Sequence, residues 1–158
     1  MMMVYSQVWE ALAFLKKLDR LVRIALGYSY DWKISVPPMG KHNFILATKT
    51  ESQKGNLKLW DVLDNSFHSQ IRNAFAHSDY SIDEIGKRIW FYNYSGKGWE
   101  MKEISFDDWS KRFAYTILLV HRLFEIHYER REKLPQKMGV STFKINLPLE
   151  KRGFNRLL

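Results

Sequence analysis

The sequence predicts a mainly α-helical domain, a helical bundle with a short β-hairpin or meander inserted before its last long helix. Apolar residues recur at helical spacing in three segments, and a short aromatic, β-branched region lies between the second and the third. At 158 residues, the chain is long enough to bury one hydrophobic core. Its hydrophobic share of 46% and its aromatic share of 15% are richer than those of a disordered chain.

The first predicted helix spans residues 4–26. Its apolar stripe consists of Val4, Val8, Ala11, Leu15, Leu18, Val22 and Ala25. Gly27 is expected to end the helix, because glycine readily takes the left-handed conformation found at helix ends. Residues 28–55 contain two adjacent prolines and a polar run without a sustained period. We therefore expect a long connection there, with one short helical turn near residues 43–47.

The second predicted helix begins after Asn56, which is a plausible N-cap, and ends at His77. Its stripe consists of Leu59 or Trp60, Leu63, Phe67, Ile71 and Ala74. From Tyr80 onward the pattern changes to YSIDEI, RIWFYNY and WEMKEI, three short segments rich in aromatic and β-branched residues. Gly86 and the sequence SGKG at residues 95–98 separate these segments, which predicts short strands joined by turns.

The last predicted helix opens with Ser105 and Asp108, which have the spacing of a capping pair. It is expected to end after Lys133, because Pro135 follows. Its apolar residues are Trp109, Phe113, Ile117, Val120 and Phe124, with Leu118, Leu119, Leu123 and Ile126 on adjoining faces. Such a wide apolar surface predicts a central helix or an oligomer interface. The predicted domains are therefore a helical domain, residues 1–134, and a basic, mobile C-terminal tail, residues 135–158.

The net charge of +8 favours anionic partners such as nucleic acid. No stretch approaches the roughly 18 unbroken apolar residues of a membrane span, so we expect no membrane partner. The chain has no cysteine, which excludes disulfides and cysteine nucleophiles and fits a cytoplasmic protein. His121 and His127 lie six positions apart, a poor spacing for shared metal ligation. We expect no metal and no cofactor.

Three polar residues near the end of the second predicted helix have no role in packing: Arg72, Asn73 and His77. At about 100° per residue, Asn73 and His77 lie one turn apart on the same helix face. Arg72 adjoins Asn73, and its long side chain can swing toward the same groove. A cation, an amide and a titratable imidazole together suit a phosphodiester site. By spacing alone, a surface arginine and a helix-ending histidine need no further explanation, and that alternative is the favoured one.

The string RNAFAH, which begins at Arg72, closely resembles the signature of HEPN domains. These are helical domains, many of which are ribonucleases of defence, toxin and RNA-processing systems. The resemblance implies that His77 transfers the proton, Arg72 stabilises the phosphate charge and Asn73 positions groups in the cleft. Asp79 and Tyr80 follow as supporting candidates. Toxin members of one subgroup place a tyrosine two residues after the histidine, whereas Tyr80 is three after, so the modification of that tyrosine does not carry over.

In the HEPN family, two protomers usually pair so that both motifs face one cleft, and RNA is cut there without a metal. The resemblance therefore implies a metal-independent endoribonuclease that acts on RNA as a homodimer, in a toxin or antiviral defence system. An antitoxin or another regulatory protein is a further expected partner. The alternative is a non-catalytic HEPN-like dimerisation module that binds RNA or a nucleotide within a larger assembly. A plain helical interaction domain is a third reading.

Overall fold

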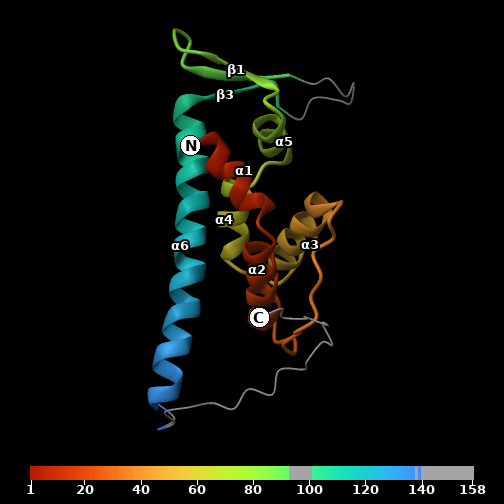
Figure 1. Cartoon of the computed structure of the whole chain (residues 1–158), viewed down its shortest axis with the longest axis vertical. Helices are drawn as coiled ribbons and strands as arrows, with labels where there is room; N and C mark the ends of the chain where they lie inside the picture. The colour runs from red at the N-terminus through yellow and green to blue at the C-terminus, as the bar shows by residue number, and fades with distance from the viewer. Residues whose placement is uncertain (93–100, 138, 140–158) are drawn as a thin grey trace, which may run out of the picture. The chain divides into compact units, whose positions relative to one another are not determined.

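The computed structural model describes residues 1–92, 101–137 and 139, and within them the chain is mainly helical with one three-stranded meander (Figure 1). The elements in chain order are α1 (Met2–Glu10), α2 (Leu12–Ala25), α3 (Lys41–Lys54), α4 (Leu59–Ser66), α5 (Ser69–His77), β1 (Tyr80–Asp83), β2 (Arg88–Phe91), β3 (Glu103–Ser105) and α6 (Phe106–Lys137). The predicted mainly helical fold, with the meander before the last long helix, is confirmed.

The chain forms two compact units, Met1–Phe124 and Glu125–Leu158. The first unit contains the meander, all helices before it and the first part of α6. The predicted boundary after residue 134 stays a prediction, because almost all of the predicted tail lies outside the described residues.

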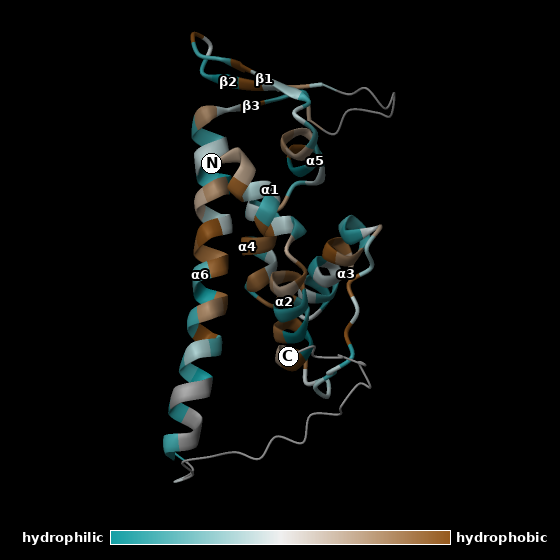
Figure 2. Cartoon of the chain, viewed as in Figure 1, coloured by the Kyte–Doolittle hydropathy of each residue, from teal (hydrophilic) through white to brown (hydrophobic). Residues whose placement is uncertain are grey.

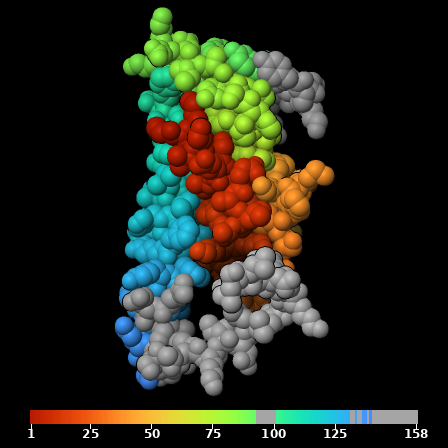
Figure 3. Space-filling view, in the orientation of Figure 1, coloured from red at the N-terminus to blue at the C-terminus, as the bar shows by residue number. Residues whose placement is uncertain are grey.

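The core of the first unit is a cluster of buried aromatic rings from α1, α5 and α6 and from Phe67, which follows α4. The ring centroid of Trp109 on α6 lies 5.1 Å from that of Tyr5 on α1 and 4.7 Å from that of Phe75 on α5, both edge-on. Trp9 continues the cluster toward Phe67, 4.9 Å away. Each such pair contributes about 0.5–1.5 kcal/mol beyond its area burial. In Figure 3, the N-terminal helices (red) lie directly against α6 (teal) and α5 (yellow-green).

The predicted first helix is wrong in one respect, because the chain breaks at Ala11 into α1 and α2. Ala11 is extended, with φ −72° and ψ 107°. The break has a packing reason: residues five apart on one unbroken helix point about 140° away from each other. Trp9 and Phe14 are both buried, with ring centroids 5.5 Å apart, and they meet because the axis turns between them. Gly27, at φ 80°, follows the end of α2, as predicted.

The predicted long connection over residues 28–55 is also wrong in its second half, which forms α3 over fourteen residues. The buried side chains of α3 are Ile45, Thr48 and Ser52, so two of its three inward positions are polar. The Thr48 hydroxyl donates to the Asp19 carboxylate of α2 at 3.1 Å. Because hydroxyls rather than methyl groups face inward, the sequence shows no apolar period there.

The predicted helix from Asn56 to His77 is two helices, α4 and α5, separated at Phe67 and His68. Asn56 is not an N-cap: it takes a left-handed φ of 51° just after α3 ends, and Lys58 occupies the N-cap position of α4. Phe67 and His68 are both extended. The direction of α5, and therefore of the motif it carries, depends on this junction.

Side chains from α1 and α6 stabilise the junction between α4 and α5. The Tyr5 hydroxyl donates to the Ser66 carbonyl at 2.9 Å and accepts the His68 N–H at 3.0 Å. Arg112 Nη1 donates to two further carbonyls at the end of α4, at 3.1 and 3.2 Å. Burial raises the pKa of the Tyr5 hydroxyl well above its usual value, so the hydroxyl keeps its proton at neutral pH. These bonds satisfy backbone groups that a continuous helix would have paired internally.

The meander confirms the predicted strands. Its order is β1-β2-β3, antiparallel throughout, with Tyr80 opposite Phe91 and Ile89 opposite Ile104. Ile89, Phe91 and Ile104 are buried, so one face of the sheet packs on the core. Gly86 lies in the tight turn between β1 and β2, where its N–H donates to the Asp83 carboxylate at 2.8 Å. The predicted SGKG turn lies outside the described residues.

Helix α6 begins as predicted: the Asp108 N–H donates to Ser105 Oγ at 3.0 Å. It continues past Pro135 to Lys137, which the prediction had placed beyond its end. A proline this close to a helix end removes a bond only from the final turns, where little else depends on it. No helix in the described part of the chain is long and apolar enough to cross a membrane.

Candidate active site at the end of α5

Helix α5 carries the Arg-Asn-x3-His motif, and its inner face anchors it to the aromatic core. Ile71, Ala74 and Phe75 are buried. Asn73 and His77 are exposed, and because α5 is unbroken from Ser69 to His77 they lie one turn apart. The structure therefore places the amide and the imidazole on one accessible side of this helix.

The chain turns sharply after His77. Ser78 takes a left-handed conformation with φ 60°, and the Asp79 N–H donates to the Ala74 carbonyl at 2.8 Å. This closure ends α5 and starts β1 two residues later. His77 is consequently the last helical residue and is exposed. Figure 1 shows α5 next to the meander that follows it.

The Arg72 side chain makes contacts different from those of its two motif partners. Its guanidinium pairs with the Glu10 carboxylate of α1, and the side chain is only 13% exposed. The Lys41 ammonium of α3 binds the other carboxylate oxygen of Glu10 at 2.6 Å. We call Glu10, Lys41 and Arg72 the ion cluster. Because neighbouring helical residues point about 100° apart, Arg72 faces α1 while Asn73 faces solvent.

The ion cluster holds two cations on one carboxylate. Partial burial raises the pKa of Glu10, but its hydrogen bond to Lys41 and the Arg72 charge outweigh burial and bring the pKa below its usual value. Glu10 is therefore ionised at neutral pH. The Arg72 Nε is buried and has no hydrogen-bond partner in the described part of the chain. Sequence reasoning missed Glu10 and Lys41, since neither belongs to the motif and Glu10 lies 62 positions from Arg72.

The two supporting candidates lie directly beyond the motif. Tyr80 begins β1, and its ring lies edge-on to Phe75 with centroids 5.1 Å apart, so it packs against the helix that carries His77. Asp79 is half-buried, and its carbonyl accepts the Tyr92 N–H at 2.8 Å. Both residues therefore join α5 to the sheet.

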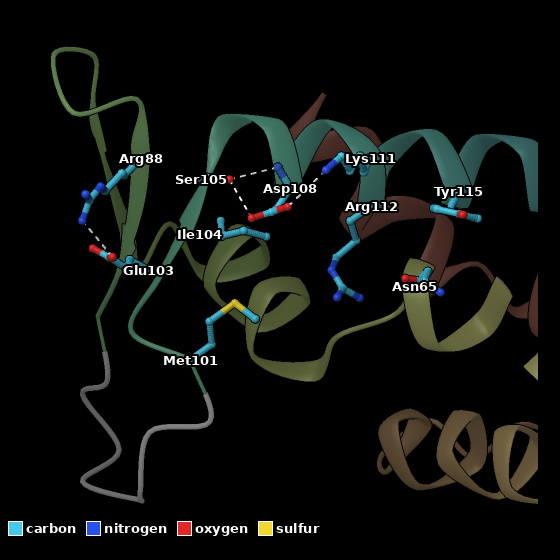
Figure 4. A pocket seen from close by; sticks show the side chains of 10 residues that line it. All are labelled: Asn65, Arg88, Met101, Glu103, Ile104, Ser105, Asp108, Lys111, Arg112 and Tyr115. Carbon is cyan, nitrogen blue, oxygen red and sulfur yellow. Dashed lines mark hydrogen bonds and ion pairs between the residues drawn. The ribbon is translucent and has the colours of Figure 1, made fainter. Parts of the chain in front are cut away.

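A second polar feature of the first unit is an open cleft of about 690 Å³ between the meander, α4 and the start of α6 (Figure 4). Its lining residues are Asn65, Arg88, Met101, Glu103, Ile104, Ser105, Asp108, Lys111, Arg112 and Tyr115. The motif residues are not among them. Most charges in the cleft are matched: Arg88 pairs with Glu103 at 2.9 Å, and Lys111 with Asp108 at 3.6 Å. Arg112 supports the end of α4. Most of the charge in the cleft is therefore neutralised by pairs within it, while Glu103 Oε2 and Arg112 Nε are buried without a hydrogen-bond partner among the described residues.

The remaining histidines do not form a metal site. The described residues contain no group of three or more histidine or acidic side chains arranged to hold an ion. His42 lies on α3, with its ring 6.3 Å from that of Phe67, and His121 is exposed on α6.

No family model, no curated protein and no solved structure matches this chain. The functional argument therefore rests on the motif and on the geometry around it. The end of α5 offers an accessible imidazole and an amide one turn away. The ion cluster lies on the neighbouring side of the same helix.

Proposed function

We propose that this protein is a metal-independent endoribonuclease of the HEPN type, and that it acts as a homodimer. One observation carries the proposal: His77 and Asn73 lie exposed, one turn apart, at the end of a short helix that also carries Arg72. Both polar groups are therefore accessible to a substrate, and the helix that carries them is fixed to the core by its buried inner face. The mainly helical fold and the meander after the motif agree with the proposal.

In the proposed reaction, the His77 imidazole accepts the proton of a ribose 2′-hydroxyl. The 2′-oxygen attacks the adjacent phosphorus, and the bond from phosphorus to the 5′-oxygen breaks. The leaving 5′-oxygen takes a proton from an acid on the opposite side, which in a two-fold dimer is the second copy of His77. The products are a 2′,3′-cyclic phosphate and a 5′-hydroxyl. Asn73, one turn from His77, orients the ribose or the phosphate by hydrogen bonding.

Arg72 would stabilise the negative charge that develops on the phosphate oxygens. Its pairing with Glu10 does not cancel this role, because Lys41 adds a second cation and leaves the ion cluster with a net positive charge. The carboxylate fixes the direction of the guanidinium. In this proposal Glu10 is a positioning residue, which acts through Arg72 rather than on the substrate.

The exposed side of α6 supports the homodimer. Ala114, Ile117, His121 and Phe124 follow one another at alternating intervals of three and four residues, and all are exposed. Leu118 beside them is 58% exposed. This is the spacing of a helix–helix seam, and the colouring of α6 in Figure 2 shows hydrophobic residues recurring along it. A symmetric contact there would cover these side chains and add a second motif to the assembly.

The proposed setting is a cytoplasmic toxin or antiviral defence system, in which a regulatory protein or antitoxin restrains the nuclease. One observation favours a second candidate function, a non-catalytic module that binds RNA or a nucleotide. Arg72 is largely buried and already paired, as an arginine kept for stability would be. The two candidates differ in whether His77 is needed for a chemical step.

The direct experiment incubates the purified protein with total RNA and compares the wild type with His77→Ala and Asn73→Ala. Proton-transfer groups contribute on the order of 10²–10⁴ in rate, so His77→Ala should nearly abolish cleavage. Both side chains are exposed, so the melting temperature should change little. If the folded wild type cuts no RNA, or if His77→Ala cuts as fast, the catalytic proposal fails and the binding module remains.

A further inference from the structure

The loop between α2 and α3 presents three aromatic side chains to solvent. Tyr28 is 55% exposed, Tyr30 42% and Trp32 58%. We call residues 28–33 the aromatic loop. Large aromatic rings contribute most to stability when they are buried, and the core of this unit already contains its own ring cluster. Three exposed rings within five residues therefore need another explanation.

The aromatic loop is fixed at both ends. At its start, the Tyr28 N–H donates to the Arg23 carbonyl at 2.9 Å, which closes the end of α2. At its far end, Ile34 and Val36 are buried. Between them, the Arg20 guanidinium donates to two carbonyls of the loop, from Nε at 3.2 Å and from Nη2 at 3.0 Å. The hydrogen bonds anchor the backbone of the loop while its rings remain exposed. Binding a ligand therefore costs little conformational entropy.

The rings are also arranged relative to one another. Tyr30 and Trp32 form an edge-on pair with centroids 4.4 Å apart and an interplanar angle of 62°. The guanidinium carbon of Arg20 lies 5.2 Å from the Tyr30 ring centroid. In an edge-on pair, one ring directs its edge at the other and keeps its own faces open. The loop therefore offers flat aromatic surface beside a cation.

Basic residues lie on the aromatic loop and on the helix that precedes it. The basic residues on and beside the loop are Lys16, Arg20, Arg23 and Lys33. The first three lie on one face of α2, because they are four and three residues apart. Three acidic residues lie near these cations, and all are engaged. Asp19 accepts from Arg23 Nε at 2.7 Å, Asp31 accepts the Lys33 N–H at 2.8 Å, and Glu51 pairs with Lys54 at 3.2 Å. The cations outnumber the carboxylates, so the rim attracts an anionic chain.

We propose that the aromatic loop is a stacking platform for the unpaired bases of single-stranded RNA. Bases stack on Trp32 and on its neighbouring tyrosines, while the basic face of α2 contacts the phosphates. The inference rests on the proposed function and extends it, because it names single-stranded RNA as the form that the protein binds. The excess of positive charge beside the rings favours an anionic chain over a neutral protein surface. Duplex RNA keeps its bases stacked inside and gains only the phosphate contacts.

The test measures binding by fluorescence anisotropy with a labelled single-stranded RNA and with the same strand in a duplex. The His77→Ala background prevents cutting. Stacking on an aromatic ring is worth about a five- to 150-fold change in Kd per base, so Trp32→Ala should weaken single-strand binding by a factor in this range. Trp32→Phe should retain most of the affinity, and duplex binding should not change. The matched control is Trp90→Ala, which removes a tryptophan 40% exposed on β2.

Single-strand affinity that is equal in wild type and Trp32→Ala would overturn the proposal, and so would an equal loss toward duplex. Far-UV circular dichroism establishes that each variant is folded. If Trp32→Ala is not, Tyr28→Ala removes a second exposed ring of the aromatic loop and should likewise weaken single-strand binding but not duplex binding. A single-stranded DNA of the same sequence separates this inference from the proposed function. Stacking requires no 2′-hydroxyl, so the DNA should bind through Trp32 without being cut. Binding without any RNA cleavage would leave the platform in place and contradict the nuclease alone.

Discussion

The ion cluster gives the sharpest prediction for stability, because one carboxylate joins three helices. We consider Glu10→Gln, which keeps the shape of the side chain and removes its charge. The substitution leaves the Arg72 guanidinium, 13% exposed, without its counter-charge, and it weakens the 2.6 Å contact with Lys41. Helices α1, α3 and α5 lose the charge that connects them.

The magnitude follows from the degree of burial. Exposed ion pairs contribute up to about 1 kcal/mol, and breaking a fully buried pair costs roughly 3–5 kcal/mol. The Glu10 side chain is 34% exposed, so solvent screens part of the interaction, and the cluster lies between these limits. We expect Glu10→Gln to lower the free energy of unfolding by about 2 kcal/mol. For a chain of this size, that corresponds to a decrease of about 4–8 °C in melting temperature.

The assay is urea denaturation and thermal melting of wild type and Glu10→Gln at several pH values. Glu51→Gln is a matched control, because its pair with Lys54 is exposed and should contribute less than about 0.5 kcal/mol. The folded pKa of Glu10 lies below its unfolded value. Its contribution is therefore complete above the unfolded pKa and is lost as pH falls through the folded pKa. The difference between wild type and Glu10→Gln should be largest near neutral pH and shrink below about pH 5.

Two results would refute this account of the ion cluster. One is a Glu10→Gln protein as stable as Glu51→Gln at neutral pH. The other is a difference that persists unchanged in acid, where both proteins carry a neutral side chain at position 10.

Two further predictions concern the junction and the assembly. Tyr5→Phe removes a buried hydroxyl that bonds the Ser66 carbonyl and the His68 N–H, and it should reduce the free energy of unfolding by about 1–3 kcal/mol in urea denaturation. A loss below 0.5 kcal/mol, roughly the lower end for one hydrogen bond, would contradict that role. Light scattering should give about twice the 18.9 kDa chain mass for wild type, and a folded monomer for Ile117→Glu; a wild-type monomer at micromolar concentration would contradict the seam on α6.

The elements that the sequence predicted well are determined by residues close together in the chain. Strands β1, β2 and β3 lie in segments rich in aromatic and β-branched residues, and Gly86 marks the turn between the first two. The start of α6 is encoded by Ser105 and Asp108, three residues apart. Gly27 ends α2 because few other residues take its positive φ without strain. In each case, the residues that decide the structure are neighbours in the chain.

The elements that the sequence could not predict depend on distant side chains. Nothing about Ala11 marks a helix break, since alanine favours helices; the break follows from the packing of Trp9 and Phe14. The break at Phe67 is stabilised by Tyr5 and Arg112, which lie far away in the sequence. Helix α3 escaped notice because its buried positions are largely polar and bond to α2.

The candidate site divides in the same way. The motif and the exposure of Asn73 and His77 follow from helical spacing, which is local. The partners of Arg72 do not, because Glu10 and Lys41 come from two other helices. Glutamate and lysine are common on protein surfaces, so neither residue stands out in the sequence. Only the fold brings them together with Arg72. The motif thus indicates a chemistry, while the structure adds the group that orients its cation.

The central claim is that His77 drives cleavage through the ribose 2′-hydroxyl, and one measurement tests it most directly. A single-stranded RNA is incubated with the protein in excess chelator, and its products are compared with those from a copy that carries one 2′-deoxynucleotide at the cleaved position. The account predicts a 2′,3′-cyclic phosphate and a 5′-hydroxyl, no cleavage at the deoxy position and none with His77→Ala. Products with a 3′-hydroxyl, or cleavage that stops under chelation, would contradict it.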